Sequence, residues 1–192
     1  MRGFKERADV EAVIRWIDAQ PVLRGTETVA LHSAAGRVLA NDVTSAVSVP
    51  PFRRAAMDGW ALRGEETFGA AETDPIPFRI VGTAMPGTPF EGSIGRGEAV
   101  RIMTGAPVPD DADAVLRAEE GEESGDALRV RAAVAPKRHV GAVGEDIATG
   151  AVVLPAGRRL RPQDVGVAAS IGLGSVDVVA PPRVRILTTG DE

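Results

Sequence analysis

Pro50-Pro51-Phe52 runs through Arg53-Arg54-Ala55 into Ala56-Met57-Asp58-Gly59-Trp60, and this stretch decides how the chain is interpreted. The two prolines exclude a regular helix and set an extended entry. Gly59 follows a single carboxylate, Asp58, and permits a close backbone approach that a Cβ would block. Trp60 can anchor the turn in a core. The stretch predicts one acid held on a rigid turn, as a site for a cation or an oxyanion needs, and the alternative is a plain turn with a solvated Asp58.

A second stretch, Val100 to Pro109, predicts a short buried strand that ends in Thr-Gly-Ala-Pro. Gly105 and Pro107 stop the strand. They leave the Thr104 hydroxyl and nearby backbone N–H groups at the mouth of the sheet, where they suit a phosphate or another oxyanion. The alternative interpretation is that Thr104 only caps a turn.

Together these stretches resemble the MoeA family, the molybdopterin molybdenumtransferases, whose animal relative is the C-terminal domain of gephyrin. The family pattern reads P-x-F-x-x-S-A-M-D-G-Y-A, then R-I-M-T-G-A-P-x-P, then G-E-D-I, then S-T-G-D-E-L. The corresponding segments occur here in the same order, at Pro50 to Ala61, Arg101 to Pro109, Gly144 to Ile147 and Thr188 to Glu192. One short motif would be weak, but four in order make a chance match improbable.

The resemblance implies an enzyme that takes adenylylated molybdopterin and molybdate, hydrolyses the adenylate with release of AMP and places molybdenum on the dithiolene. It implies a site between the subunits of a homodimer, with Asp58, Thr104 and Asp146 as catalytic residues and Glu192 as a further site residue. Asp58 and Glu192 would hold Mg²⁺, which prefers carboxylates. Thr104 would bond a phosphate or molybdate oxygen, and Asp146 would orient a basic side chain or a water, unless it is only a turn acid.

The resemblance also implies molybdopterin adenylyltransferase and molybdoenzymes as protein partners, and a cytoplasmic location. The sequence departs from the family pattern where Arg53-Arg54-Ala55 replace Asp-Asn-Ser, and where 140–143 lack the arginines that many members carry before Gly-Glu-Asp. An anionic pterin and molybdate need fixed positive charge, which Arg53 and Arg54 are expected to supply. The alternative is a non-catalytic paralogue that acts as a dimerisation or partner-binding module.

The expected fold is mainly β with a few helices. Residues 1–46 and 144–182 are expected to form a discontinuous β/α subdomain, 47–143 an inserted barrel-like β subdomain, and 183–192 the start of a truncated α/β domain. The chain is thus expected to be an N-terminal fragment, inactive alone. A helix over 9–20 has a narrow apolar stripe, which is expected to pack on the missing domain or on a second subunit.

Other elements follow from local patterns. A helix is expected from Pro162 to near Gly172, and another from Ser33 to Leu39. The acidic stretch from Asp110 to Asp126 is expected to be a solvated hairpin edge. Strands are expected at 28–31, 61–63, 78–82, 99–103, 114–118, 128–134, 151–154 and 175–179.

Composition excludes several classes of protein. The 192 residues contain 22 Gly and 14 Pro, which favours a turn-rich β fold over a helix bundle. There is no Cys, so disulfides and thiolate metal sites are excluded. The net charge of −5 argues against nucleic acid as a partner. No apolar run reaches the ~18 residues of a membrane span.

Overall fold

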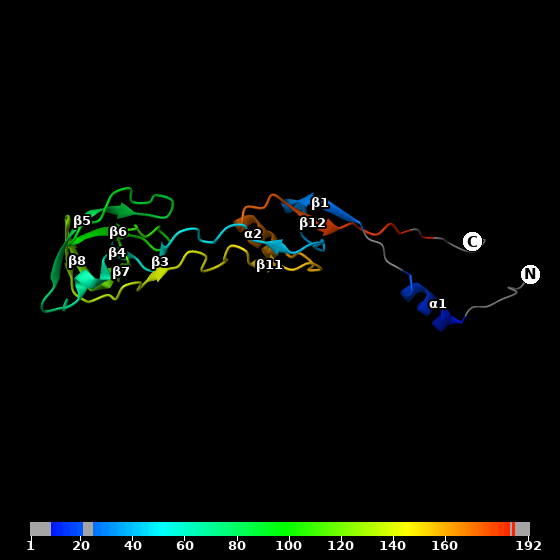
Figure 1. Cartoon of the computed structure of the whole chain (residues 1–192), viewed down its shortest axis with the longest axis horizontal. Coiled ribbons are helices and arrows are strands. Elements are labelled where there is room, and N and C mark those ends of the chain that lie inside the picture. The colour runs from blue at the N-terminus through cyan, green and yellow to red at the C-terminus, as the bar shows by residue number, and fades with distance from the viewer. Residues whose placement is uncertain (1–8, 21–24, 185, 187–192) are drawn as a thin grey trace, which may run out of the picture.

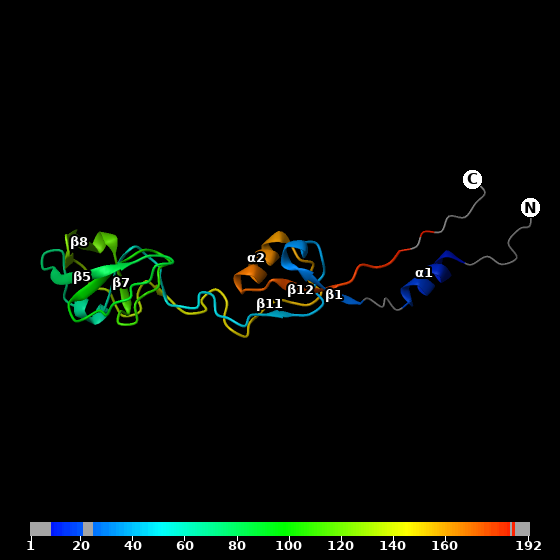
Figure 2. The same cartoon turned by 90° about the horizontal axis from the view of Figure 1, so that it is seen from above.

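The structure, a computed structural model, describes residues 9–20, 25–184 and 186. They form two lobes joined by a two-stranded arm, and helix α1 (Val10–Asp18) lies apart from both lobes (Figure 1). We call residues 25–45 and 148–180 the α/β lobe, residues 54–141 the sheet lobe, and the segments 46–53 and 142–147 between them the arm. Figure 2 shows the same two lobes and arm from above.

The sheet lobe is built on a curled six-stranded sheet in the order β7-β4-β6-β5-β9-β8. Strands β5 and β6 pair in parallel, and the other neighbours are antiparallel. The strands are β4 (Gly59–Leu62), β5 (Ile76–Ala84), β6 (Glu98–Ile102), β7 (Ala114–Arg117), β8 (Gly121–Ser124) and β9 (Ala127–Val130). A further short pair, β3 (Arg54–Ala55) with β10 (Val140–Gly141), lies where the arm enters.

Both faces of this sheet carry a core, which is why neighbouring residues of β4 and β7 are apolar on either face. Trp60 and Leu62 of β4 belong to one hydrophobic cluster, and Ala61 between them belongs to another. On β7, Leu116 and Val115 divide between the same two clusters. Successive side chains of a strand point to opposite faces, so this alternation places apolar side chains on both faces.

The α/β lobe combines two small antiparallel pairs with helix α2 (Pro162–Ser170). Strand β1 (Thr26–Ala30) pairs with β12 (Ser175–Val179), and β2 (Val43–Thr44) pairs with β11 (Val152–Leu154). The 3₁₀ turn η1 (Leu31–Ser33) completes the packing. Its core draws on both halves of the chain: Leu31, Ala34, Leu39, Val43, Leu154, Leu160, Ala168, Ile171, Val176 and Val178.

The arm is held by backbone hydrogen bonds between its two segments. The Val49 N–H donates to the Ile147 carbonyl at 2.8 Å, and the Val49 carbonyl accepts from Asp146 and Ile147 at 3.0 Å each. The Gly144 N–H donates to Pro50 O at 2.9 Å. The arm therefore carries Asp146 to the base of the sheet lobe.

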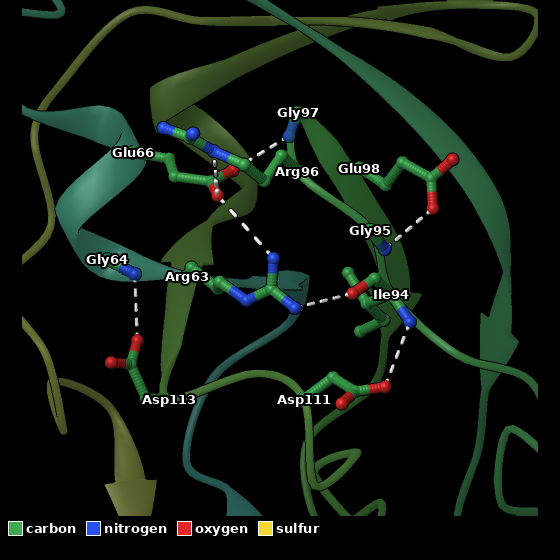
Figure 3. A network of polar contacts seen from close by, with 10 residues as sticks. All are labelled: Arg63, Gly64, Glu66, Ile94, Gly95, Arg96, Gly97, Glu98, Asp111 and Asp113. Carbon is green, nitrogen blue, oxygen red and sulfur yellow. Dashed lines mark hydrogen bonds and ion pairs between the residues drawn. The ribbon is translucent and has the colours of Figure 1, made fainter.

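Carboxylates hold the loop before β6 in place (Figure 3). Three backbone N–H groups of this loop each donate to an acid, and Arg63 donates to the Ile94 carbonyl at 2.8 Å. The pairs are Ile94 with Asp111 at 3.1 Å, Gly95 with Glu98 at 2.8 Å and Gly97 with Glu66 at 2.7 Å. In a strand these backbone N–H groups would donate to the carbonyls of a neighbouring strand. In this irregular loop the carboxylates accept these hydrogen bonds instead.

The predicted helix over Ser33 to Leu39 is wrong. The helical turn covers only Leu31–Ser33, and Gly36 adopts φ +82°, which ends any helix. The Gly36 N–H then donates to Leu160 O at 2.7 Å, and Leu39 donates to Arg158 O at 2.9 Å. Partners more than a hundred residues away thus satisfy the backbone groups that a local helix would have used.

One strand end and the solvation of the acidic edge in the sheet lobe also differ from expectation. Strand β9 ends at Val130, where a strand to 134 was expected. The acidic stretch does form an edge hairpin through β8, but it is not simply solvated, since Glu120 pairs with Arg117 at 2.5 Å and Glu123 pairs with Arg101.

Candidate functional site

Asp58 stands immediately before β4, and the backbone fixes its place. Gly59 has φ +153°, and a Cβ there would lie 1.9 Å from Leu116 O and 2.9 Å from Ala118 N. The Asp58 carbonyl accepts from the Ala118 N–H at 2.9 Å. Trp60 is buried next to it. Glycine at 59 is therefore required by the close approach of β7, and the acid is held on a rigid turn as the sequence predicted.

Thr104 lies in the tight turn that follows β6. The Ala106 N–H donates to Met103 O at 2.9 Å, and Gly105, third in this turn, has φ +85°. A positive φ at the third position suits glycine. The Gly105 N–H donates to Ala55 O at 2.8 Å, which ties the turn to the segment that leads to Asp58.

The structure brings Asp58 and Thr104 together. The Thr104 backbone N–H and hydroxyl both donate to Asp58 Oδ1, at 2.7 and 2.6 Å. These two bonds, the hydroxyl's first, hold the pKa of Asp58 below its ordinary value, against a small opposing effect of desolvation. The carboxylate is exposed and charged at neutral pH. Its Oδ2 has no hydrogen-bond partner among the described residues, so a cation or a ligand donor can reach it.

A hollow of about 280 Å³ opens beside Asp58. Trp60 and Met103 contribute its apolar lining, and Arg101 and Glu123 its charged groups. Arg101 and Glu123 form an ion pair, and the Trp60 indole N–H donates to Glu123 Oε2 at 3.3 Å. The sequence predictions missed Arg101 and Glu123 as site residues. Arg101 begins the same motif as Thr104, which was a usable signal, but no local pattern links it to an acid on β8.

The Arg53 guanidinium faces inward to the backbone. It donates to the carbonyls of Ala112 and Pro109 at 3.1 Å each and of Asp110 at 3.4 Å. Asp110 Oδ1 also lies 3.5 Å from it. These contacts secure the loop that follows Pro107, and they occupy much of the donor set that an anionic ligand would need.

The structure brings Arg54 and Asp146 together at the base of the sheet lobe. Arg54 contacts Asp146 Oδ2 at 3.2 Å and Glu145 Oε2 at 3.3 Å. Arg54 is paired across the strands with Gly141, where a Cβ would lie 2.4 Å from Glu145 Oε2 and 3.1 Å from Arg54 Cγ. The absence of a side chain at 141 thus leaves room for the Arg54–Glu145 contact.

Glu192, predicted to bind cofactor and metal, lies outside the described residues. Within the described ranges, no group of three or more His, Asp or Glu side chains is placed to hold a metal ion. Asp58 Oδ2 is a hard oxygen donor of the type that Mg²⁺ accepts, and Mg²⁺ commonly takes one or two carboxylates with water and ligand phosphate. Asp58 therefore fits as one ligand. Neither α1 nor α2, the helices of the described part, has the length and apolarity that a membrane crossing requires.

Comparison with known proteins places this geometry in a family. The sequence model described as "MoeA N-terminal region (domain I and II)" matches residues 8–172. The chain belongs to this family. Molybdopterin molybdenumtransferase 2 of Mycobacterium tuberculosis is 37% identical over 165 residues, covering 86% of this chain and 41% of the relative. Molybdopterin molybdenumtransferase of Staphylococcus aureus is 33% identical over 182 residues, covering 95% of this chain and 43% of the relative.

Solved structures give the same result. The molybdopterin biosynthesis MoeA protein of Pyrococcus horikoshii matches with a TM-score of 0.80 and 31% identity, over 90% of this chain and 44% of that one. The molybdopterin biosynthesis MoeA protein of Pyrococcus horikoshii OT3, in another solved structure, matches with a TM-score of 0.77 and 40% identity, over 80% of this chain and 41% of that one. The predicted fold class is confirmed. The chain spans about two-fifths of the length of the relatives that it matches.

Proposed function

We propose that this chain is the N-terminal part of a molybdenum-inserting enzyme of molybdenum cofactor biosynthesis, with adenylylated molybdopterin and molybdate as substrates and AMP as a product. The Asp58–Thr104 pair carries the proposal: an ionised acid and a hydroxyl share one rigid position beside a hollow. The names of the relatives, molybdopterin molybdenumtransferase, support it.

Each residue has a proposed role in cleaving the adenylate. Phosphoanhydride cleavage needs charge neutralisation on the phosphate and a positioned water. Asp58 would hold Mg²⁺, with Glu192 as a further ligand, and the ion would supply that neutralisation. Thr104 fixes the Asp58 carboxylate through its backbone N–H and its hydroxyl. To bond a phosphate or molybdate oxygen, the hydroxyl would turn its single proton from Asp58 to the ligand. Asp146 and Arg54 form a charged pair that orients a water or a substrate group, and Arg53 acts by holding the 109–112 loop.

The working protein is proposed to be a cytoplasmic homodimer that receives its substrate from molybdopterin adenylyltransferase and delivers its product to molybdoenzymes. Helix α1 supports an intermolecular contact, because its apolar side chains Val10, Ile14, Trp16 and Ile17 are between 52% and 69% exposed. If α1 packs on a second subunit, the 192-residue chain should dimerise and Ile14→Glu should abolish the dimer in analytical ultracentrifugation. A monomeric wild-type chain would count against packing of α1 on a second subunit.

One observation favours the second candidate, a non-catalytic paralogue that serves as a dimerisation or partner-binding module. The guanidinium groups of Arg53 and Arg54, which were expected to bind the anionic substrate, both contact groups of the chain itself. A paralogue that has lost the reaction would retain the fold and its partner surface while lacking the anion site.

Complementation decides between the two. The complete reading frame that encodes this chain is expressed in cells that lack their molybdenumtransferase, and a molybdoenzyme is assayed. We expect rescue, and we expect Asp58→Asn to abolish it. Asp126→Asn, in the exposed turn between β8 and β9, is the matched control and should rescue as the wild type does. If the wild-type protein is well expressed and folded but does not restore molybdoenzyme activity, the result would favour the non-catalytic paralogue.

A further inference from the structure

A second hollow, of about 370 Å³, opens beside β7 at the edge of the sheet. Met57 lines this hollow, whereas Asp58 and Gly59 line the one described above. Arg117, which also lines the second hollow, is the strand partner of Gly59. The two hollows therefore adjoin the same stretch of backbone but share no lining residue. The volume of the second is in the range of small-molecule sites, about 300–1,000 Å³.

One wall of this hollow is a segment with an unusual backbone. Lys137 has φ +66° and His139 has φ +57°, and no other non-glycine residue in the described ranges has a positive φ. Such a conformation is unfavourable for a residue with a Cβ and persists where the surroundings hold it. Here the Lys137 N–H donates to Asp113 O at 2.7 Å, and the Arg138 carbonyl accepts from the Val115 N–H at 3.1 Å. The segment thus presents Arg138 and His139 from a rigid support.

The lining of this hollow carries one net positive charge, counting the histidine as uncharged. Arg117 and Arg138 contribute two guanidinium groups, and Glu120 contributes one carboxylate. Arg117 is already paired, since it lies 3.1 Å from Glu119 and 2.5 Å from Glu120. Arg138 is exposed, and its guanidinium has no hydrogen bond or ion pair with any residue that the structure describes. Arg138 is therefore the cation that an incoming anion can reach.

His139 adds a hydrogen-bond acceptor beside this cation. Its Nδ1 lies 3.0 Å from Val115 O, and because a carbonyl oxygen can only accept, Nδ1 carries the proton. In the uncharged ring Nε2 is then an acceptor, and it has no partner within the described part of the chain. Met57, which is 44% exposed, and Val134 supply apolar surface. The hollow thus combines a free cation, a free acceptor and an apolar wall.

We propose that this hollow binds a small organic acid that has one carboxylate and, next to it, an O–H or N–H group. Arg138 meets the carboxylate with the parallel N–H donors of its guanidinium. Nε2 of His139 accepts the hydrogen bond from the neighbouring O–H or N–H, and Met57 contacts the apolar remainder. A phosphate dianion fits less well, because Glu120 leaves one net positive charge to balance it. The assignment does not rest on the proposed function, which concerns the hollow beside Asp58.

Titration of the 192-residue chain with N-acetylalanine, followed by backbone amide chemical shifts in NMR, tests the assignment. This probe has one carboxylate, an N–H group next to it and a methyl group. Its shift changes should concentrate at residues 133–139 and at Met57. Three comparison probes should each bind at least about fivefold more weakly: acetate, which lacks the donor, the methyl ester of N-acetylalanine, which lacks the charge, and inorganic phosphate.

Variants assign the two recognition groups. Arg138→Gln should weaken binding of N-acetylalanine by about tenfold, the loss of a charge-assisted contact. Arg129→Gln, exposed on β9, makes the same change in net charge and should alter the affinity by less than about twofold. His139→Asn keeps a residue type that tolerates positive φ and removes the imidazole. Its affinity for N-acetylalanine should fall to that for acetate, while the affinity for acetate stays unchanged.

Glu120→Gln tests the charge of the lining. The change raises the net charge of the hollow from one to two, so the affinity for phosphate should rise more than the affinity for N-acetylalanine. Glu122→Gln, exposed on β8, makes the same change in net charge outside the hollow and should alter both affinities by less than about twofold. Thermal unfolding of each variant checks that it folds.

Three outcomes would overturn the proposal: no shift change at residues 133–139, a methyl ester that binds as tightly as the acid, or an equal loss in Arg129→Gln and Arg138→Gln. Asp58→Asn separates this hollow from the proposed function. It should abolish complementation and leave the binding of N-acetylalanine unweakened. Loss of both in this variant would place the probe in the hollow beside Asp58 and would also overturn the proposal.

Discussion

Gly59 is the residue whose substitution should be felt most strongly by the fold. An added Cβ would meet the Leu116 carbonyl at 1.9 Å and would require φ near +153°. The three nearest atoms, Leu116 O, Leu116 C and Ala118 N, are all backbone atoms, so they cannot move aside cheaply. We expect Gly59→Ala to lower the free energy of unfolding by about 3 kcal/mol, measured by urea denaturation.

Gly166 provides the control for this prediction, because it lies in α2 and a Cβ there meets nothing within 4 Å. Gly166→Ala should raise the free energy of unfolding by about 0.5–1 kcal/mol through lower backbone entropy in the unfolded chain. A loss of similar size in both variants would show that the close approach at Gly59 is not the cause.

Thr104 should tune the acidity of Asp58. Thr104→Val removes the hydroxyl bond and keeps the backbone bond, so the pKa of Asp58 should rise toward its ordinary value of about 3.9 without reaching it. Titration of the Asp58 carboxyl carbon by NMR measures this. Thr104→Ser retains the hydroxyl and should titrate as the wild type does. An unchanged pKa in the valine variant would mean that the hydroxyl does not bond Asp58 in solution.

The sequence led to Asp58 and Thr104 because both lie in short motifs with turn residues beside them. It did not lead to Arg101 and Glu123, which come from strands far apart in sheet order and meet only through the curl of the sheet. It also treated Arg53 and Arg54 alike, whereas Arg53 donates to three backbone carbonyls and lies near one carboxylate, and Arg54 contacts two carboxylates. The residue type shows which side chains can carry charge or donate hydrogen bonds. The partners that they contact depend on which strands the fold brings together.

At the scale of elements, helix α2 depends on one buried acid. Asp164 is 3% exposed and accepts from the Arg161 N–H at 2.9 Å and from Arg158 at 2.8 Å. Bonds from Arg158 and Arg161 hold the pKa of Asp164 far below its ordinary value. Because the folded-state pKa is the lower one, this acid stabilises the fold above its unfolded value of about 3.9, and the contribution disappears as the pH falls toward the folded value.

Asp164→Asn should therefore lower the melting temperature by several degrees at pH 7. The gap to the wild type should narrow between about pH 5 and pH 2, as the wild type loses the contribution of its carboxylate. Thermal unfolding across this range by circular dichroism measures it. Asp126→Asn is the control, since this exposed turn residue should change stability by less than about 0.5 kcal/mol. A constant gap at every pH would assign the effect to packing rather than charge.

Element boundaries were predicted well where local chemistry sets them. The last strand was predicted at 175–179, and β12 is Ser175–Val179. The helix predicted from Pro162 to near Gly172 is α2, which begins at Pro162 and is followed by Gly172 with φ +86°. The helix predicted over Ser33 to Leu39 failed because Gly36 and Leu39 bond residues 158 and 160 instead. Local patterns cannot anticipate partners that arrive from the other half of a discontinuous lobe.

At the scale of the whole molecule, the two lobes have separate cores, and the arm joins them. The buried residues of the cluster around Leu39 all belong to the α/β lobe, with Val49 and Ile147 of the arm packed against them. The clusters around Leu128 and Ile102 draw on the sheet lobe. Proteins open in contiguous cooperative units, and the backbone amides within one unit share a similar free energy of opening. The lobes should accordingly unfold as units whose stabilities are set independently.

Truncation of one core should leave the other lobe's protection unchanged. Leu39 is 1% exposed and Leu128 is fully buried, so each change to Ala should cost about 2–5 kcal/mol within its own lobe. Hydrogen exchange followed by mass spectrometry should show faster exchange at β1, β12 and α2 in Leu39→Ala, with β4 and β6 unaffected, and the opposite pattern in Leu128→Ala. Faster exchange throughout both lobes in either variant would show that the arm, with the Arg54 pairs to Glu145 and Asp146 at its end, couples them into one cooperative unit. The Asp58–Thr104 site lies wholly in the sheet lobe, so independence also predicts that Leu39→Ala leaves the pKa of Asp58 unchanged.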